Sequence, residues 1–213
     1  MNWVATIAVF LAIAAAQSEG APAALARQAQ LRRMQGRLQS VASHSAAFQD
    51  AQRKFQEIAE NGRLRQPKPK TTVLTADEIN AYLAEGGVAL PDAVQRVHFS
   101  SLPRLVTAAA RIDFDRLTAA RRINNPFMAA LFTGVHDVSV EARASGEGGI
   151  GFVHVESVTI DGIKVPRAAM QFLVDYYLRP KYGPDIGLDS RFPLPAHIDA
   201  VVVGNDQVTV TQR

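Results

Sequence analysis

The most informative segment of this 213-residue chain is Leu74-Thr75-Ala76-Asp77-Glu78-Ile79-Asn80-Ala81-Tyr82-Leu83. Its Thr and Glu are spaced so that the Thr75 hydroxyl accepts from the backbone N–H of Glu78, while the Glu78 carboxylate accepts from the backbone N–H of Thr75. Ile79, Tyr82 and Leu83 then share one face. The segment predicts an amphipathic helix with a defined start.

Alternating and β-branched segments after this helix predict about six strands. Short Gly, Asn and Asp turns separate several of them, which is typical of an antiparallel meander. The glycine-rich turn at residues 145–149 lacks the Gly-Lys-Ser/Thr ending of a phosphate loop. The sequence therefore predicts an α+β fold with an antiparallel sheet, its strands at residues 94–100, 105–114, 135–144, 150–160, 198–203 and 208–211.

Two further helices are predicted among the strands. A short one spans Asp115 to Ile123, and Asn124-Asn125-Pro126 ends it. A second starts at Pro166 and reaches Leu178, with an apolar stripe at helical spacing. Between the two helices lies the apolar run Phe127 to Phe132, which must be buried, face lipid or bind a ligand.

Residues 1–16 contain the apolar run Val4 to Ala16, which is too short for a bilayer-spanning helix of roughly 20 residues. Small residues at Ala14 and Ala16, followed by polar residues, favour a cleaved signal peptide. No Lys or Arg precedes the run. A retained membrane anchor and a buried helix are the alternatives, and the signal peptide predicts a periplasmic or other extracytoplasmic location.

Residues 17–62 predict a long basic amphipathic helix that ends at Asn61-Gly62. Between residues 17 and 70 there are ten Lys and Arg against four Asp and Glu. A cationic face fits contact with an anionic membrane surface, and ordinary solvation is the alternative. A proline-containing linker at residues 63–71 predicts the domain boundary. The cationic face comprises Arg27, Arg32, Arg33 and Arg37, and a heptad-like stripe comprises Leu31, Met34, Leu38, Val41, Phe48, Phe55 and Ala59.

Composition and motifs argue against several functional classes. The chain has no cysteine, which excludes disulfides, thiolate metal sites and a lipoprotein anchor. Its basic segment lacks interleaved aromatic residues, so nucleic acid is not an expected partner. The five histidines form neither an HExxH motif nor a tight cluster with acidic residues, and GxSxG is absent. We expect no enzyme activity, no cofactor and no metal.

The order of elements resembles that of bacterial tubular lipid-binding (TULIP-like) periplasmic proteins of the YceB and LmeA-like types. The capped helix at Leu74–Leu83, the strand and turn at Val155–Pro166 and the helix at Pro166–Leu178 carry this resemblance, which covers residues 72–213. It implies a strongly curved antiparallel sheet wrapped around a helix, with an apolar groove between them. The chain departs from this pattern in its long basic N-terminal helix and its missing lipoprotein cysteine.

The main functional hypothesis is non-covalent binding of a lipid or another long apolar ligand in that groove. Each buried methylene contributes about 0.8 kcal/mol, so a chain of about a dozen carbons can bind without polar contacts. The alternative is an envelope scaffold that acts through its N-terminal helix and has a solid core. The sequence does not distinguish a hollow groove from a packed one. The predicted groove walls are Ile79, Tyr82, Leu83, Phe127, Met128, Leu131, Phe132, Met170, Leu173, Val174 and Tyr177.

Overall fold

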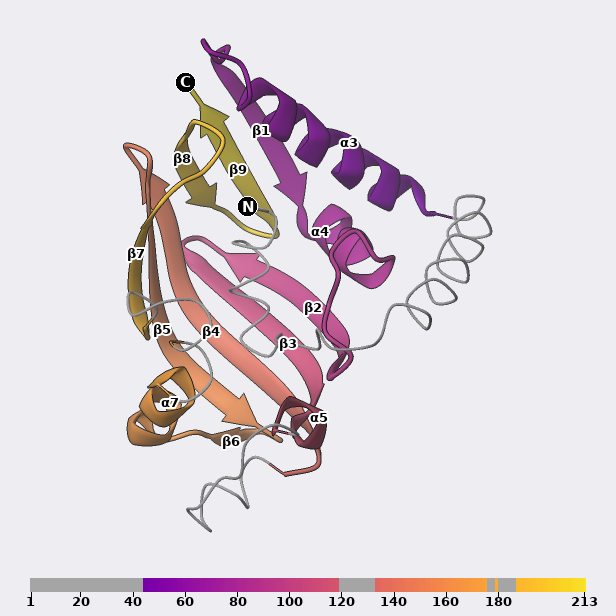
Figure 1. Cartoon of the computed structure of the whole chain (residues 1–213), viewed down its shortest axis with the longest axis vertical. Helices are drawn as coiled ribbons and strands as arrows, with labels where there is room; N and C mark the ends of the chain where they lie inside the picture. Colours follow the sequence, from indigo (N-terminus) through magenta and orange to yellow (C-terminus); the bar gives the residue numbers. More distant parts are fainter. Residues whose placement is uncertain (1–43, 119–132, 176–178, 180–186) are drawn as a thin grey trace, which may run out of the picture.

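The computed structural model describes residues 44–118, 133–175, 179 and 187–213. Within them the chain forms an α+β fold around a nine-stranded antiparallel sheet that does not close into a barrel (Figure 1). The strands are β1 Lys70–Thr75, β2 Val94–Leu102, β3 Leu105–Asp113, β4 Val135–Glu147, β5 Ile150–Ile160, β6 Ile163–Lys164, β7 Asp189–Pro193, β8 Ile198–Val203 and β9 Gln207–Gln212. The helices are α3 Ala46–Asn61, α4 Ala76–Ala84, α5 Phe114–Thr118 and α7 Arg167–Leu173.

Strand β4 is the centre of the sheet. One edge pairs with β3 through residues 135–143 and then meets β8 at the Gly146–Val201 pair, while the other edge pairs with β5. The path runs β1-β9-β8-β4-β3-β2, and β5 adds β6 and β7 on the far side of β4. The antiparallel sheet and all six predicted strands are confirmed. Strands β1, β6 and β7 were not predicted.

The capping box predicted for α4 is confirmed. Thr75 is extended at φ −79° and ψ 159°, and its hydroxyl accepts from the N–H of Glu78 at 3.2 Å. The Glu78 carboxylate accepts from the N–H of Thr75 at 2.9 Å and from Lys54 Nζ at 2.5 and 2.7 Å. Because Glu78 is buried, its ion pair with α3 is what makes the buried charge tolerable.

The prediction of one long helix over residues 17–62 is wrong at Ser45. Ser45 is extended at φ −64° and ψ 158°, and its hydroxyl accepts from the N–H of Phe48, so α3 begins at Ala46. The Glu85 carboxylate also accepts from the N–H and the hydroxyl of Ser45, at 2.9 and 2.6 Å. These side-chain bonds compete with helical backbone bonds at this position. Residues 1–43, including the four predicted membrane-contacting arginines, lie outside the described residues.

Helix α3 packs on the sheet and is not a separate appendage. Ala51 and Phe55 belong to one buried cluster and Ile58 to another, and both clusters include strand residues. The boundary predicted at residues 63–71 therefore does not separate α3 from the sheet, and β1 already begins at Lys70. The reason is that the apolar stripe of α3 completes the core of its own chain. The end of the predicted helix at Asn61 is confirmed.

A buried amide pair fixes the C-terminal end of α3. Asn61 Nδ2 donates to the Lys68 carbonyl at 2.9 Å and to Gln212 Oε1 at 3.1 Å. Gln212 Nε2 in turn donates to the carbonyls of Ile58 and Ala196 at 2.9 and 2.7 Å. These bonds satisfy buried polar groups and join α3, β9 and the β7–β8 connection.

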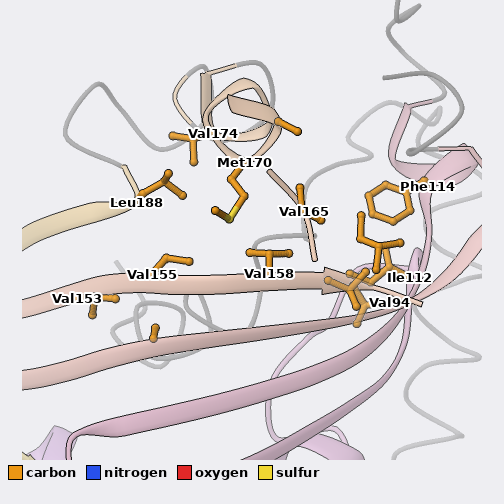
Figure 2. Packing of buried hydrophobic residues seen from close by; sticks show 14 residues of the cluster. Val94, Ile112, Phe114, Val153, Val155, Val158, Val165, Met170, Val174 and Leu188 are labelled. Carbon is orange, nitrogen blue, oxygen red and sulfur yellow. The ribbon is translucent and has the colours of Figure 1, made fainter. Parts of the chain in front are cut away.

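Helix α7 covers the other end of the sheet. Met170 and Val174 point toward Val155 and Val158 on β5, and Leu188 lies beside them (Figure 2). The predicted start at Pro166 is close to the observed one, since Pro166 occupies the N-cap position. Only the first part of the predicted Pro166–Leu178 helix is described. The same holds for the helix predicted over residues 115–123, of which α5 is the start.

Candidate functional site

One face of the sheet carries all three buried apolar clusters, and we call it the inner face. Helices α3 and α4 cover one end of it and α7 covers the other (Figure 1). Period-two alternation places every second residue of a strand on this face. On β4 these are Val138, Val140, Ala142, Ala144 and Gly146, and on β3 they are Val106, Ala108, Ala110 and Ile112.

An apolar cavity of about 130 Å³ lies on the inner face. The described helices contribute no residue to its lining, which comes from β2–β5, β7–β9 and the β7–β8 connection. Among the described residues of the lining, Ser145 alone is polar. The lining comprises Phe99, Val106, Ala108, Val140, Ala142, Ala144, Ser145, Gly151, Phe152, Val153, Phe192, Leu194, Pro195, Ile198, Val201, Val203, Val208 and Val210.

Small side chains explain why the inner face is hollow here. Ala108 pairs with Val140 across β3 and β4, and Ala142 and Ala144 follow on β4. Gly151 faces the cavity from β5. Valine or isoleucine would fill such positions with two or three more carbons. Apart from Ser145, the described lining residues are apolar, so the cavity is suited to holding an apolar group.

The half-buried residues Phe192, Leu194 and Pro195 line the cavity from β7 and the β7–β8 connection, and we call them the rim. The backbone holds this rim in place, because the N–H of Leu194 donates to the Gly149 carbonyl at 2.7 Å. Ala196 and the residue after it have positive φ values of 56° and 54°, which turn the chain back toward β8. Gln212 then binds the Ala196 carbonyl, so both ends of the rim segment are anchored.

Two broader depressions, of about 920 and 900 Å³, are less suited to an apolar ligand. The first is lined in part by Arg111 and Asp137, which form an ion pair at 3.4 Å. The second includes Arg143 and Asp189, which pair with Glu156 and Arg167 respectively. These exposed ion pairs make both linings partly charged, although the first lining also includes Leu83, one of the predicted groove residues.

The predicted groove residues do not come together at the cavity. Ile79 and Leu83 are buried in the cluster under α3 and α4, where the Tyr82 ring stacks on Phe48 at a ring distance of 5.6 Å and lies tilted against Phe55 at 4.6 Å. Met170 and Val174 belong to the separate cluster under α7. None of these five residues lines the cavity. The other predicted wall residues lie outside the description, namely Phe127, Met128, Leu131, Phe132, Tyr177 and the side chain of Leu173.

Three histidines make carboxylate contacts at separate places in the fold. His44 contacts Glu85 at 3.2 Å and His136 contacts Asp161 at 2.6 Å, while His154 contacts Asp189. Hydrogen bonds to His136 and to the N–H of Asp137 hold the pKa of Asp161 below its ordinary value, and the bond to His154 lowers the pKa of Asp189. Among the described residues, no group of three or more His, Asp or Glu is arranged to hold a metal ion.

The strand residues that line the cavity could not be recognised from the sequence, because their small size is not a distinct signal. Alanine occurs on both faces of β3, as Ala108, Ala109 and Ala110. Only the register identifies Ala108 as an inner residue, through its pairing with Phe99 and Val140. An alternation of Val and Ala on the buried side of two adjacent predicted strands was the available clue.

Comparison with protein families, curated proteins and solved structures finds nothing that matches this chain. In the part of the chain that the structure describes, no helix is both long enough and apolar enough to cross a membrane. The site must therefore be interpreted from its own geometry.

Proposed function

We propose that this protein binds the apolar part of a lipid, or of another long apolar molecule, non-covalently in the cavity on the inner face of the sheet. The observation that carries this proposal is a hydrocarbon-lined space of about 130 Å³ beside a half-buried rim. An empty apolar cavity destabilises a fold by roughly 24 cal/mol per Å³, so a cavity of this size comes at a cost in stability. Occupation by a ligand offsets that cost.

The size of the cavity limits what it holds. An engineered apolar cavity of roughly 150 Å³ binds benzene, so a cavity of 130 Å³ takes about six carbon atoms. At about 0.8 kcal/mol per methylene, their burial contributes at most about 5 kcal/mol, which corresponds to a dissociation constant of about 0.2 mM. A longer ligand therefore inserts one end into the cavity, and its other end stays outside the cavity.

The proposed setting is the bacterial envelope, outside the cytoplasm. The apolar run Val4–Ala16 supports export by a signal peptide, and the resemblance to TULIP-like proteins supports a lipid as the ligand class. The scaffold alternative depended on a free apolar stripe along the N-terminal helix. In the described part of that helix, Phe48 and Phe55 are buried within their own chain, so this part of the stripe does not favour a partner.

An NMR titration with hexanol tests the proposal at the residue level. The methyl signals of Ala108, Ala142 and Ala144 should shift in a saturable way, because these methyl groups face the cavity. The methyl signal of Ala109, on the outer side of β3, should stay in place and is the internal control. If hexanol, hexane and dodecanol all leave the cavity methyl signals unshifted, the protein does not have the proposed function.

A pair of matched substitutions, one inside the cavity and one on the outer side of the sheet, tests where the ligand binds. Ala142→Leu adds three carbons to the cavity and should weaken hexanol binding at least tenfold. Ala109→Leu adds the same three carbons on the outer side and should leave the affinity unchanged. Native mass spectrometry of the protein from its own host then asks which lipid co-purifies, and Ala142→Leu should lose it.

A further inference from the structure

The side chain of Leu194 lies over a pair of glycines on the inner face. Gly146 on β4 pairs with Gly151 on β5. A β-carbon added at Gly146 would lie 2.8 Å from Leu194 Cδ1, and one added at Gly151 would lie 3.0 Å from Leu194 Cδ2. Leu194 therefore fills a depression that exists only because neither strand residue has a side chain.

This depression adjoins the cavity, since Gly151 and Leu194 both line it. The Phe192 ring closes the depression on one side, because a β-carbon at Gly151 would lie 2.7 Å from its Cε2 atom. The Leu194 side chain thus lies between the cavity and the glycine pair. The backbone of this residue is fixed independently of its side chain, by the hydrogen bond from its N–H to the Gly149 carbonyl.

Building on the proposed function, we propose that Leu194 is the end stop of the binding cavity and sets how many carbons of an alkyl chain the protein buries. The wild-type cavity accepts about six carbons. Shortening Leu194 to alanine removes three carbons and joins the glycine depression to the cavity, so about three more carbons of ligand can enter. The residue selects for chain length and makes no contact that depends on a head group.

The test is a series of straight-chain alcohols from butanol to dodecanol, titrated against wild type and Leu194→Ala with the Ala142 methyl signal as the reporter. In wild type the affinity should rise about fourfold per added carbon and level off near hexanol. In Leu194→Ala it should keep rising to about nonanol, so that nonanol binds the variant about 60-fold more tightly than wild type. Leu194→Val is a smaller truncation. It should lengthen the alcohol at which the affinity levels off by about one carbon.

Two control variants distinguish a specific effect of the Leu194 side chain on ligand length from general destabilisation of the fold. Leu194→Met conserves side-chain volume, so its affinity should level off at the same alcohol chain length as in wild type. Leu90 is another half-buried leucine, which packs on a buried cluster of the inner face but does not line the cavity. Leu90→Ala removes the same three carbons, and its affinity should also level off at the wild-type chain length. If Leu194→Ala fails to fold, as judged by circular dichroism, Leu194→Val carries the test.

The outcomes distinguish this inference from the function on which it rests. If no alcohol of any length shifts the reporter in wild type, the proposed function fails, and the end stop fails with it. Suppose instead that wild type binds the alcohols, while the affinity of Leu194→Ala and Leu194→Val levels off at the same chain length as in wild type. In that case the cavity binds ligand, but Leu194 does not set the length that it buries.

Discussion

His136 faces a hydrogen-bond acceptor at each ring nitrogen. Nδ1 lies 2.6 Å from Asp161 Oδ2 and Nε2 lies 2.7 Å from the carbonyl of Thr133. Only the protonated imidazolium donates at both positions. The carboxylate of Asp161 and the carbonyl of Thr133 accordingly raise the pKa of His136 above 6.5, and the pKa of Asp161 is lowered below 3.8.

The pair makes stability depend on pH in a defined direction. A histidine with a raised pKa stabilises the fold below its unfolded value of about 6.5, and this stabilisation disappears as the pH rises through the folded pKa. The lowered pKa of Asp161 adds stability above about pH 4, which is lost on further acidification. The pair therefore stabilises the fold most between about pH 4 and pH 6.5.

Chemical denaturation of wild type and His136→Gln at several pH values tests this expectation. The stability difference should be largest near pH 5 and should shrink by about pH 9. A His136→Gln difference that is constant across this range would mean that the imidazolium is not the stabilising form.

At the scale of single elements, Asn80 protects the outer edge of β2. Its Nδ2 donates to the Phe99 carbonyl at 2.8 Å and its Oδ1 accepts from the Phe99 N–H at 2.7 Å. The amide thus imitates one residue of a neighbouring strand. An unprotected edge offers backbone groups to other chains and promotes aggregation.

Asn80→Ala should lower the free energy of unfolding by about 2 kcal/mol, because it leaves two backbone groups of Phe99 without these partners. It should also increase aggregation in light scattering, because the exposed edge can pair with a second chain. Asn80→Asp retains the acceptor for the N–H and should fall between alanine and wild type. If Asn80→Ala matches wild type in both measurements, water replaces the amide fully.

The elements differ in how far the sequence predicted them. The α4 cap was predictable because its Thr and Glu bond within four residues, and β2–β5, β8 and β9 were predictable from alternation and turns. Strand β7 was missed because Asp189–Pro193 is short and polar and is a strand only through its pairing with β5. The cavity was missed for a similar reason, since the strands that carry Ala142, Gly151 and Val208 come together only in the folded sheet.

At the scale of the whole molecule, α3 connects two of the three clusters of the core. Ala51 and Phe55 pack with Leu74 from β1, while Ile58 packs with Val210 from β9. Deleting buried large side chains costs about 2–5 kcal/mol each, and the total stability of a domain is about 5–15 kcal/mol. The loss of α3 therefore removes an amount comparable to the stability of the entire fold.

A chain beginning at residue 64, close to the boundary predicted from sequence, should fail to unfold cooperatively and should bind the dye ANS through its exposed apolar surface. A chain beginning at His44 retains all contacts described above, including the bonds of Ser45 to Glu85, and should unfold in one cooperative transition. Calorimetry and ANS fluorescence on the two chains give the comparison. If the shorter chain unfolds cooperatively as well, the sheet and α4 are stable without α3, and the boundary at residues 63–71 is a true domain boundary.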